Sequence, residues 1–373
     1  MFHIDFRNTL KLIKELDWKL LGIVFLIFSF GIVVLTSATH ANATGNFMQI
    51  YKQIIGMILG IGLLFFILLI DYNFLGKYYK EIYVLSILLL AIVLIPGLGV
   101  SRGGARSWIH VGFDLQTSEI VKLTFIISYA KIVEMKKSKL NTLKGIIQVG
   151  FYSVPFLGLM ISQPDLGGAI VFFCIIFAML FVAGLNKKII LRGVIIVLIL
   201  CPIFYLLMGA HQKQRIDAFL HPEDVNLKGN YQVMQSLISI GSGGITGKGL
   251  YNGSQNQEGF LPVQESDFVF AVIGEELGAI GMTAVILMFI FFLFRLLNVA
   301  KEAKDLYGAL IVMGVVGMFA YQIIQNIGMT VALIPVTGVT LPFVSAGASS
   351  VLTSFANLGL VLNVCMRRKK INF

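Results

Sequence analysis

Residues 261–281 read LPVQESDFVFAVIGEELGAIG and place acidic side chains where an apolar run begins. Asp267 stands at the start of that run, and a carboxylate close to hydrocarbon costs several kcal/mol unless it faces a watery cavity or a partner. It therefore either caps the following helix by accepting backbone N–H bonds, or it faces a polar cavity. Glu275 and Glu276 point about 100° apart on a helix, so both cannot face one site. Their spacing indicates no role for them.

Other segments carry charges that could bind an anion. Glu119 and Lys122 are three residues apart, so on a helix they share a face and can neutralise one another. Two segments supply further cations, namely Arg102 and Arg106 in SRGGARSW and Lys213 and Arg215 in HQKQRIDAF. An anionic ligand at the outer surface would explain this set.

Each of these residues also has a structural explanation. Glu119 and Lys122 fit an ion pair inside a helix bundle, and Arg102 and Arg106 could extend to lipid headgroups. Asp165 in QPDLGG follows a proline at a break between two apolar runs, which is typical of a helix N-cap. The spacing alone predicts a charged outer cavity and names no reaction.

The cysteines and histidines predict no protein-built metal site. Cys174, Cys201 and Cys365 all lie within or at the edge of apolar runs, and the five histidines are far apart without ligand spacing. The formal charge of +10 does not indicate nucleic acid, because the basic residues are scattered between apolar runs instead of forming one patch.

The elements that must position these residues are membrane-spanning helices. The chain is 57% hydrophobic and 13% charged, with a mean hydropathy of +0.87, and this excess of apolar residues has to face lipid. A spanning helix needs about 20 apolar residues. The sequence predicts an all-α polytopic membrane protein with ten transmembrane helices, at 18–38, 49–70, 80–98, 117–134, 146–162, 166–185, 190–209, 267–297, 306–329 and 349–366.

The basic residues predict the orientation of these helices. With a cytoplasmic N-terminus, 21 of the 29 lysines and arginines lie in the inside segments, as the positive-inside rule requires. Residues 1–373 then form a single membrane domain with short cytoplasmic tails at 1–17 and 367–373. A large outer loop at 210–266 joins the seventh and eighth helices, and a loop of that length is usually functional or disordered. A short helix on the membrane surface is expected at about 230–240.

Several stretches together resemble the SEDS family (shape, elongation, division and sporulation), which includes RodA, FtsW and SpoVE. The matching stretches are RGGARSWI (102–109), QTSEIVKL (116–123), QPDLGGA (163–169), QKQRIDAFLHPE (212–223), the long run 231–281 and NIGMTVALIPVTGVTLPFVSAGASS (326–350). They occur in family order along nearly the whole chain. One departure is SAGASS, where the family usually has SYGGSS, so Ala346 cannot supply a tyrosine.

The resemblance implies an enzyme of the bacterial cytoplasmic membrane. A SEDS protein is a peptidoglycan glycosyltransferase that polymerises lipid II into β-1,4 glycan strands outside the membrane, with a class B penicillin-binding protein as its transpeptidase partner. The family's essential acidic residue falls on Asp267. The growing glycan, held by undecaprenyl pyrophosphate, is α-linked and the product is β-linked, so the transfer inverts and requires a base. Asp267 is the expected base.

The same resemblance does not identify the positive charges that stabilise the pyrophosphate leaving group. The pyrophosphate needs cations, from the arginines and lysines above or from a divalent ion such as Mg²⁺ or Mn²⁺. The alternative function is a flippase for lipid-linked precursors, in which the same cavity would hold the headgroup during transfer. The inner halves of the helices carry few ionisable groups, which favours chemistry on one side. Within the family, the short tails favour RodA.

Overall fold

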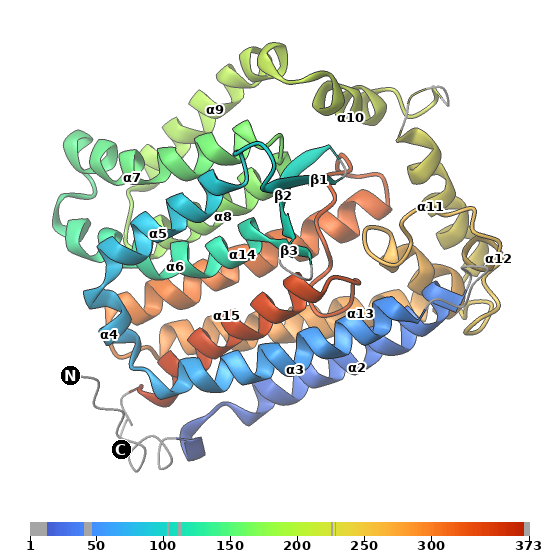
Figure 1. Ribbon diagram of the computed structural model, residues 1–373, viewed down its shortest axis with the longest axis horizontal. Coiled ribbons are helices and arrows are strands. Elements are labelled where there is room, and N and C mark those ends of the chain that lie inside the picture. The colour runs from blue at the N-terminus through green and yellow to red at the C-terminus, as the bar shows by residue number, and fades with distance from the viewer. Residues whose placement is uncertain are drawn as a thin grey trace.

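The computed structural model describes residues 13–40, 47–102, 104–110, 114–224, 227 and 229–368, and most of them are helical (Figure 1). Each of the ten predicted apolar runs coincides with a helix. These helices are α2 (Trp18–His40), α3 (Met48–Leu69), α5 (Tyr79–Ile92), α6 (Thr117–Lys136), α7 (Leu143–Ser162), α8 (Leu166–Val182), α9 (Lys187–Leu207), α13 (Val269–Lys301), α14 (Leu306–Thr330) and α15 (Ala348–Met366). Four shorter helices are α4 (Tyr72–Lys77), α10 (Ala210–Leu220), α11 (Asn230–Gly243) and α12 (Ser254–Gln257), and single 3₁₀ turns are η1 (Ile13–Glu15) and η2 (Lys137–Lys139).

Six of the described helices are long and apolar enough to cross a membrane, namely α2, α3, α7, α13, α14 and α15. α8 is apolar but shorter, and α6 is interrupted by charged residues. The chain is therefore a helical multi-pass membrane protein. The count of ten spans stays a prediction.

α15 lies at the centre of the helix bundle (Figure 1), and 94% of its membrane-length window is buried. α3 packs along it through glycines that leave no room for a side chain. A Cβ atom at Gly56 would lie 2.8 Å from the Ala348 carbonyl oxygen, and one at Gly60 would lie 2.9 Å from the Phe355 Cβ. Small residues of this kind let two helix backbones approach closely in a membrane.

A three-stranded antiparallel sheet stands between α5 and α6, although the sequence predicted an all-α protein. β1 (Gly99–Arg102) pairs with β2 (Ala105–His110), and β2 pairs with β3 (Asp114–Gln116). The predicted third span ended at residue 98, but α5 ends at Ile92 and β1 follows soon after. Gly104, with φ of 87°, makes the turn between β1 and β2. Because β3 runs directly into α6, the sheet fixes the first turn of that helix.

The two ends of the described chain meet at one end of the bundle. The Cys365 thiol of α15 lies 3.9 Å from the Glu15 carbonyl oxygen of η1, and Asp17 forms an ion pair with Arg295 of α13. Arg368 forms another with Glu302. Much of both predicted tails, at 1–12 and 369–373, lies outside the described residues.

α13 is broken near its N-terminal end. Gly278 has φ of 63° and ψ of −163°, which no helical residue adopts. The break separates a short first part, residues 269–277, from the long apolar part that follows.

Candidate active site

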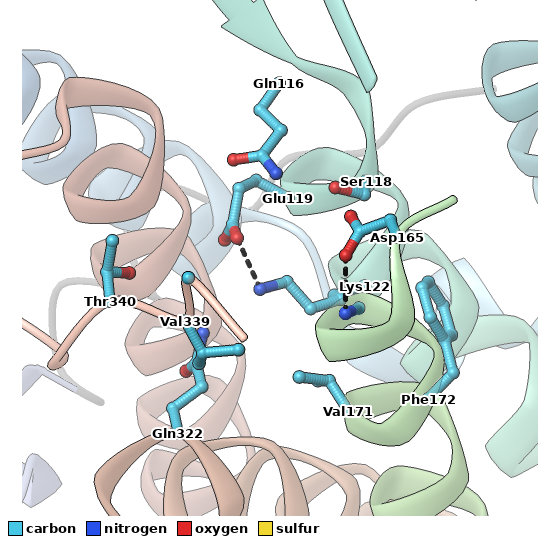
Figure 2. Close-up of a pocket in the computed structure, with 12 residues that line it drawn as sticks. Gln116, Ser118, Glu119, Lys122, Asp165, Val171, Phe172, Gln322, Val339 and Thr340 are labelled. Carbon is cyan, nitrogen blue, oxygen red and sulfur yellow. Dashed lines mark hydrogen bonds and ion pairs between the residues drawn. The ribbon is translucent and has the colours of Figure 1, made fainter. Parts of the chain in front are cut away.

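A small polar cavity lies between α6, α8, α14 and the segment that precedes α15. Figure 2 shows Glu119 and Lys122 reaching into it from α6, Asp165 from the start of α8, and Gln322 from α14. Gly338, Val339 and Thr340 close its remaining side. The expected charged cavity is thus built from helices that are far apart in the sequence.

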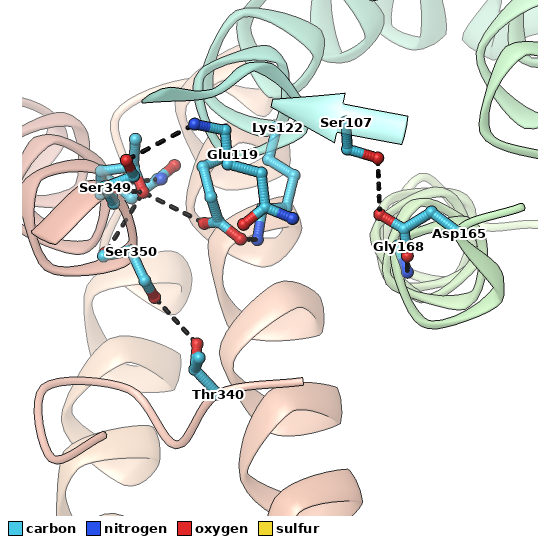
Figure 3. Close-up of polar contacts among 11 residues, drawn as sticks. Ser107, Glu119, Lys122, Asp165, Gly168, Thr340, Ser349 and Ser350 are labelled. Carbon is cyan, nitrogen blue, oxygen red and sulfur yellow. Dashed lines mark hydrogen bonds and ion pairs between the residues drawn. The ribbon is translucent and has the colours of Figure 1, made fainter. Parts of the chain in front are cut away.

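Glu119 and Lys122 form the ion pair that their spacing predicted. The Lys122 Nζ donates to the Glu119 Oε1 at 2.6 Å, and the two side chains are only 5% and 11% exposed. The Thr353 hydroxyl of α15 donates to the other oxygen of Glu119 at 3.2 Å. Figure 3 shows how this carboxylate joins α6 to the serine-rich start of α15. The pair is both structural and in contact with the cavity.

Asp165 caps α8, as its position after Pro164 predicted. Its carboxylate accepts from the Gly168 N–H at 2.8 Å and lies 3.5 Å from the Ser107 hydroxyl of β2. Burial raises the pKa of this carboxyl, while the bond from Gly168 and the positive charge of Lys122 oppose the rise. Asp165 therefore holds the sheet and α8 together at the cavity wall.

Asp267 does not cap the helix that follows it. α13 begins at Val269 after Phe268, and no side chain caps its first turn. The Asp267 carboxylate instead accepts from the Ser266 hydroxyl at 3.1 Å. Its Oδ2 would lie 3.5 Å from a Cβ atom at Gly338, a residue of the cavity wall. This carboxylate is half-buried beside the cavity, and that burial raises its pKa.

The backbone around Asp267 is held by the segment that precedes α15. The Asn326 side chain of α14 donates to the Asp267 carbonyl at 3.1 Å and to the Val339 carbonyl at 2.9 Å. The Ala346 N–H donates to the Glu265 carbonyl at 2.8 Å. The backbone of Ala346 thus holds the segment that precedes Asp267, and this contact does not require a tyrosine side chain at position 346.

The predicted cations divide into two groups. Lys122 lines the cavity, and the positive charge of Arg215 on α10 lowers the pKa of both Asp165 and Asp267. Arg106 instead turns to the protein backbone, where its guanidinium donates to the carbonyls of Ile95 at 3.0 Å and Gly99 at 3.4 Å. Lys213 donates to the Leu206 carbonyl at 3.0 Å, outside the cavity lining. Arg102 lies in β1, but its side chain lies outside the described part of the structure.

Gln322 lines the cavity and was missed in the sequence. Its side chain is 2% exposed, and its Oε1 has no hydrogen-bond partner among the described residues. The signal was a row of amides in the apolar stretch YQIIQN, which places Gln322, Gln325 and Asn326 at helical spacing. A buried amide oxygen without a hydrogen-bond partner is costly. Gln322 is therefore a candidate to bind a polar group in the cavity.

Comparison with known proteins identifies the family. The family model of the cell cycle proteins FtsW, RodA and SpoVE matches residues 17–370. The chain belongs to this family. It is 37% identical to stage V sporulation protein E of Bacillus subtilis over 363 residues, with 93% of this chain and 96% of that protein covered. It is also 34% identical to a probable peptidoglycan glycosyltransferase FtsW of Trichlorobacter lovleyi, with 94% and 93% covered.

Solved structures of the family share this fold. The Thermus thermophilus rod shape determining protein RodA superposes with a TM-score of 0.71 at 30% identity, covering 95% of this chain and 98% of that one. A chain from a peptidoglycan synthase complex, studied for the coordination of polymerization and crosslinking, superposes with a TM-score of 0.82 at 29% identity, covering 95% and 99%. The preference for RodA within the family stays a prediction, because the sporulation and FtsW relatives are at least as similar in sequence.

Proposed function

We propose that this protein is a peptidoglycan glycosyltransferase that polymerises lipid II at the outer face of the cytoplasmic membrane. The observation that carries the proposal is the position of the Asp267 carboxylate in a chain of the FtsW, RodA and SpoVE family. This carboxylate does not cap α13, and it lies beside a cavity that the buried Lys122 lines. An acid and a cation on the two sides of one polar cavity suit a reaction between a sugar hydroxyl and a lipid pyrophosphate.

The residues divide the work of an inverting transfer. Asp267 accepts the proton from the attacking hydroxyl as that oxygen bonds to the anomeric carbon, and the bond from that carbon to the pyrophosphate breaks on the opposite face. The pyrophosphate leaves with its bonding electrons, so it needs positive charge and no general acid. In this proposal Lys122 and Arg215 supply that charge, and Gln322 binds a sugar or phosphate oxygen.

A divalent cation, Mg²⁺ or Mn²⁺, would supply further positive charge to the pyrophosphate in this proposal. The described residues contain no group of three or more His, Cys, Asp or Glu side chains that could hold an ion. Mg²⁺ commonly binds through one or two carboxylates together with substrate phosphates. Asp165 fits that pattern, because its carboxylate already lies in the cavity wall.

The protein works with a class B penicillin-binding protein in this proposal. The support is the superposition with a chain of a peptidoglycan synthase complex that couples polymerization with crosslinking. Membrane lipids surround the bundle, and the polyprenyl tails of the two substrates lie between its helices.

The test is polymerisation by purified protein in detergent, with and without a class B partner, from fluorescent lipid II. We expect glycan strands that a β-1,4-specific muramidase degrades. Movement of lipid II across vesicle bilayers without polymer formation would contradict the proposal in favour of a flippase.

Arg215→Ala is expected to lower kcat/KM for lipid II by about 10–100-fold, since a hydrogen bond to a charged group contributes roughly 1.5–3 kcal/mol. Added Mg²⁺ should restore part of the loss. Lys213→Ala is the matched control, because Lys213 lies two residues away on α10 and contacts a backbone carbonyl. Equal effects of the two changes would show that Arg215 does not bind the substrate.

Ten spans with both termini in the cytoplasm and residues 210–266 outside complete the proposal. Cysteines at the exposed positions 258 and 302, introduced singly after the native cysteines are replaced, test it in intact cells. A membrane-impermeant maleimide should label position 258, and should label position 302 only after lysis. Labelling of position 302 in intact cells would invert the orientation.

A further inference from the structure

The break in α13 lies just after the two residues for which the sequence indicated no role. Glu275 and Glu276 lie three and two residues before Gly278, and both residues are buried, at 0% and 1% exposed. Residues 244–249 of the outer loop insert at this point. The Lys248 N–H donates to the Glu275 carbonyl at 3.0 Å, and the Gly249 N–H donates to the Glu276 carbonyl at 2.9 Å. The loop therefore takes over two carbonyls that a continuous helix would satisfy internally.

The other side of the break is satisfied in the same way. The Ala279 N–H donates to the Gly244 carbonyl at 2.9 Å, and the Ile280 N–H donates to the Ile245 carbonyl at 3.2 Å. The fit is close, since a Cβ atom at Gly247 would lie 2.2 Å from the Glu276 carbonyl oxygen. Residues 269–277 are thus a separate short helix, and the outer loop joins it to the rest of α13.

The Glu275 carboxylate is saturated by donors of the outer loop. It accepts from the Lys248 Nζ at 2.8 Å and from the backbone N–H groups of Gln255 at 2.9 Å and Asn256 at 3.0 Å. This arrangement ties the loop from residue 248 to residue 256 onto one side chain. Charge-assisted bonds of this kind are stronger than neutral ones.

The Glu276 carboxylate joins the same loop to α2. Its Oε1 accepts from the Ser37 hydroxyl of α2 at 2.6 Å and from the Asn256 side-chain amide at 2.8 Å. The two adjacent carboxylates therefore point in different directions, as the 100° step requires, and each holds a different part of the surroundings.

We propose that Glu275 and Glu276 are positioning residues that fix the short helix 269–277, and with it Asp267, in the place where the transfer occurs. Asp267 lies directly before this helix, and the helix cannot be aligned by the rest of α13 because the chain is broken at Gly278. A base displaced by about 1 Å loses much of its effect. This inference rests on the proposed role of Asp267, and it assigns the outer loop a part in catalysis without contact with substrate.

The test compares Glu276→Ala, Glu276→Gln and Ser37→Ala, with Glu302→Ala as control. Glu302 is a carboxylate at the far end of α13 that pairs with Arg368. We expect Glu276→Ala to increase hydrogen exchange in residues 263–277 and to lower kcat for polymerisation about tenfold or more, with KM within about twofold. Glu276→Gln keeps an acceptor and should recover most of the rate. Ser37→Ala should act in the same direction with a smaller effect, which keeps the test open if Glu276→Ala does not fold.

The decisive comparison uses the Asp267→Asn background. If the carboxylates act through Asp267, adding Glu276→Ala to Asp267→Asn should cost no further activity. A further loss of the same size, or a Glu276→Ala protein with normal exchange in residues 263–277, would overturn the inference. An active Asp267→Asn protein would instead refute the proposed base, and the hydrogen-exchange result would still report whether Glu276 holds the short helix.

Discussion

Replacing Asp267 with asparagine is expected to slow glycan polymerisation by roughly 10²–10⁴-fold, the usual contribution of a general base. The side chain makes no cap bond to α13, so the change should leave folding and partner binding intact. Asp267→Glu should recover little, because the extra methylene moves the carboxylate by about 1 Å. The measurement is strand formation by equal amounts of folded wild-type and variant protein. Polymerisation by Asp267→Asn within about tenfold of wild type would exclude the base.

The acidity of Asp267 gives this experiment a second readout. Burial raises the pKa of the carboxyl, and the Ser266 hydroxyl and the charge of Arg215 lower it. A base acts only when deprotonated, so activity should be full above the raised pKa and should fall as the pH drops through it. That fall should occur at a higher pH than an exposed aspartate would show. Arg215→Ala should move it higher still, because a positive charge that favours the ionised form is removed.

Breaking the Glu119–Lys122 pair is expected to give the largest loss of stability. Either Glu119→Gln or Lys122→Met removes one partner of an ion pair that is almost fully buried, and such a loss typically costs about 3–5 kcal/mol. The double variant leaves no unpaired charge, so it should be more stable than at least the Lys122→Met protein. Thermal unfolding of the three proteins in one detergent completes the double-mutant cycle. Additive losses would show that the two side chains are not coupled.

Activity separates the two roles of this pair. If Lys122 also binds the pyrophosphate, the double variant should regain stability but not polymerisation. Thr353→Val provides the control, because it removes a hydroxyl that donates to Glu119 at 3.2 Å and leaves both charges in place. Recovery of activity in the double variant would limit the pair to a structural role.

The long helices could be predicted because a helix that crosses a membrane needs about 20 apolar residues in a row, and such a run is visible in the local sequence. α11 could be predicted too, since it occupies 230–243 where an amphipathic stretch indicated a surface helix. The sheet could not, because its strands are three to six residues long and are specified by pairing with one another. The Glu119–Lys122 ion pair on α6 could be predicted from the spacing of the two residues within one helix. The residues that face this pair across the cavity could not, because tertiary packing brings them there.

The cations show the limit most clearly. Arg106 and Arg215 looked equivalent as candidate cations for an anionic ligand. Arg106 in fact contacts the carbonyls of Ile95 and Gly99, which follow α5, whereas the charge of Arg215 lowers the pKa of two carboxyls. The break in α13 was hidden for a similar reason. Gly278 lies in an apolar stretch that predicts a continuous helix, and only the inserted loop, about 30 residues earlier in the sequence, determines that the helix stops there.

The central place of α15 has a consequence for biogenesis. α15 is the most enclosed of the six long apolar helices, and the other five precede it in the sequence, so they are synthesised before the helix around which they pack. The face of α3 that carries Gly56 and Gly60 stays uncovered until α15, its packing partner, is synthesised almost 300 residues later. Chains that stop before residue 348 would therefore present uncovered helix surfaces to the quality-control proteases of the membrane, and synthesis of α15 becomes the step that completes the core.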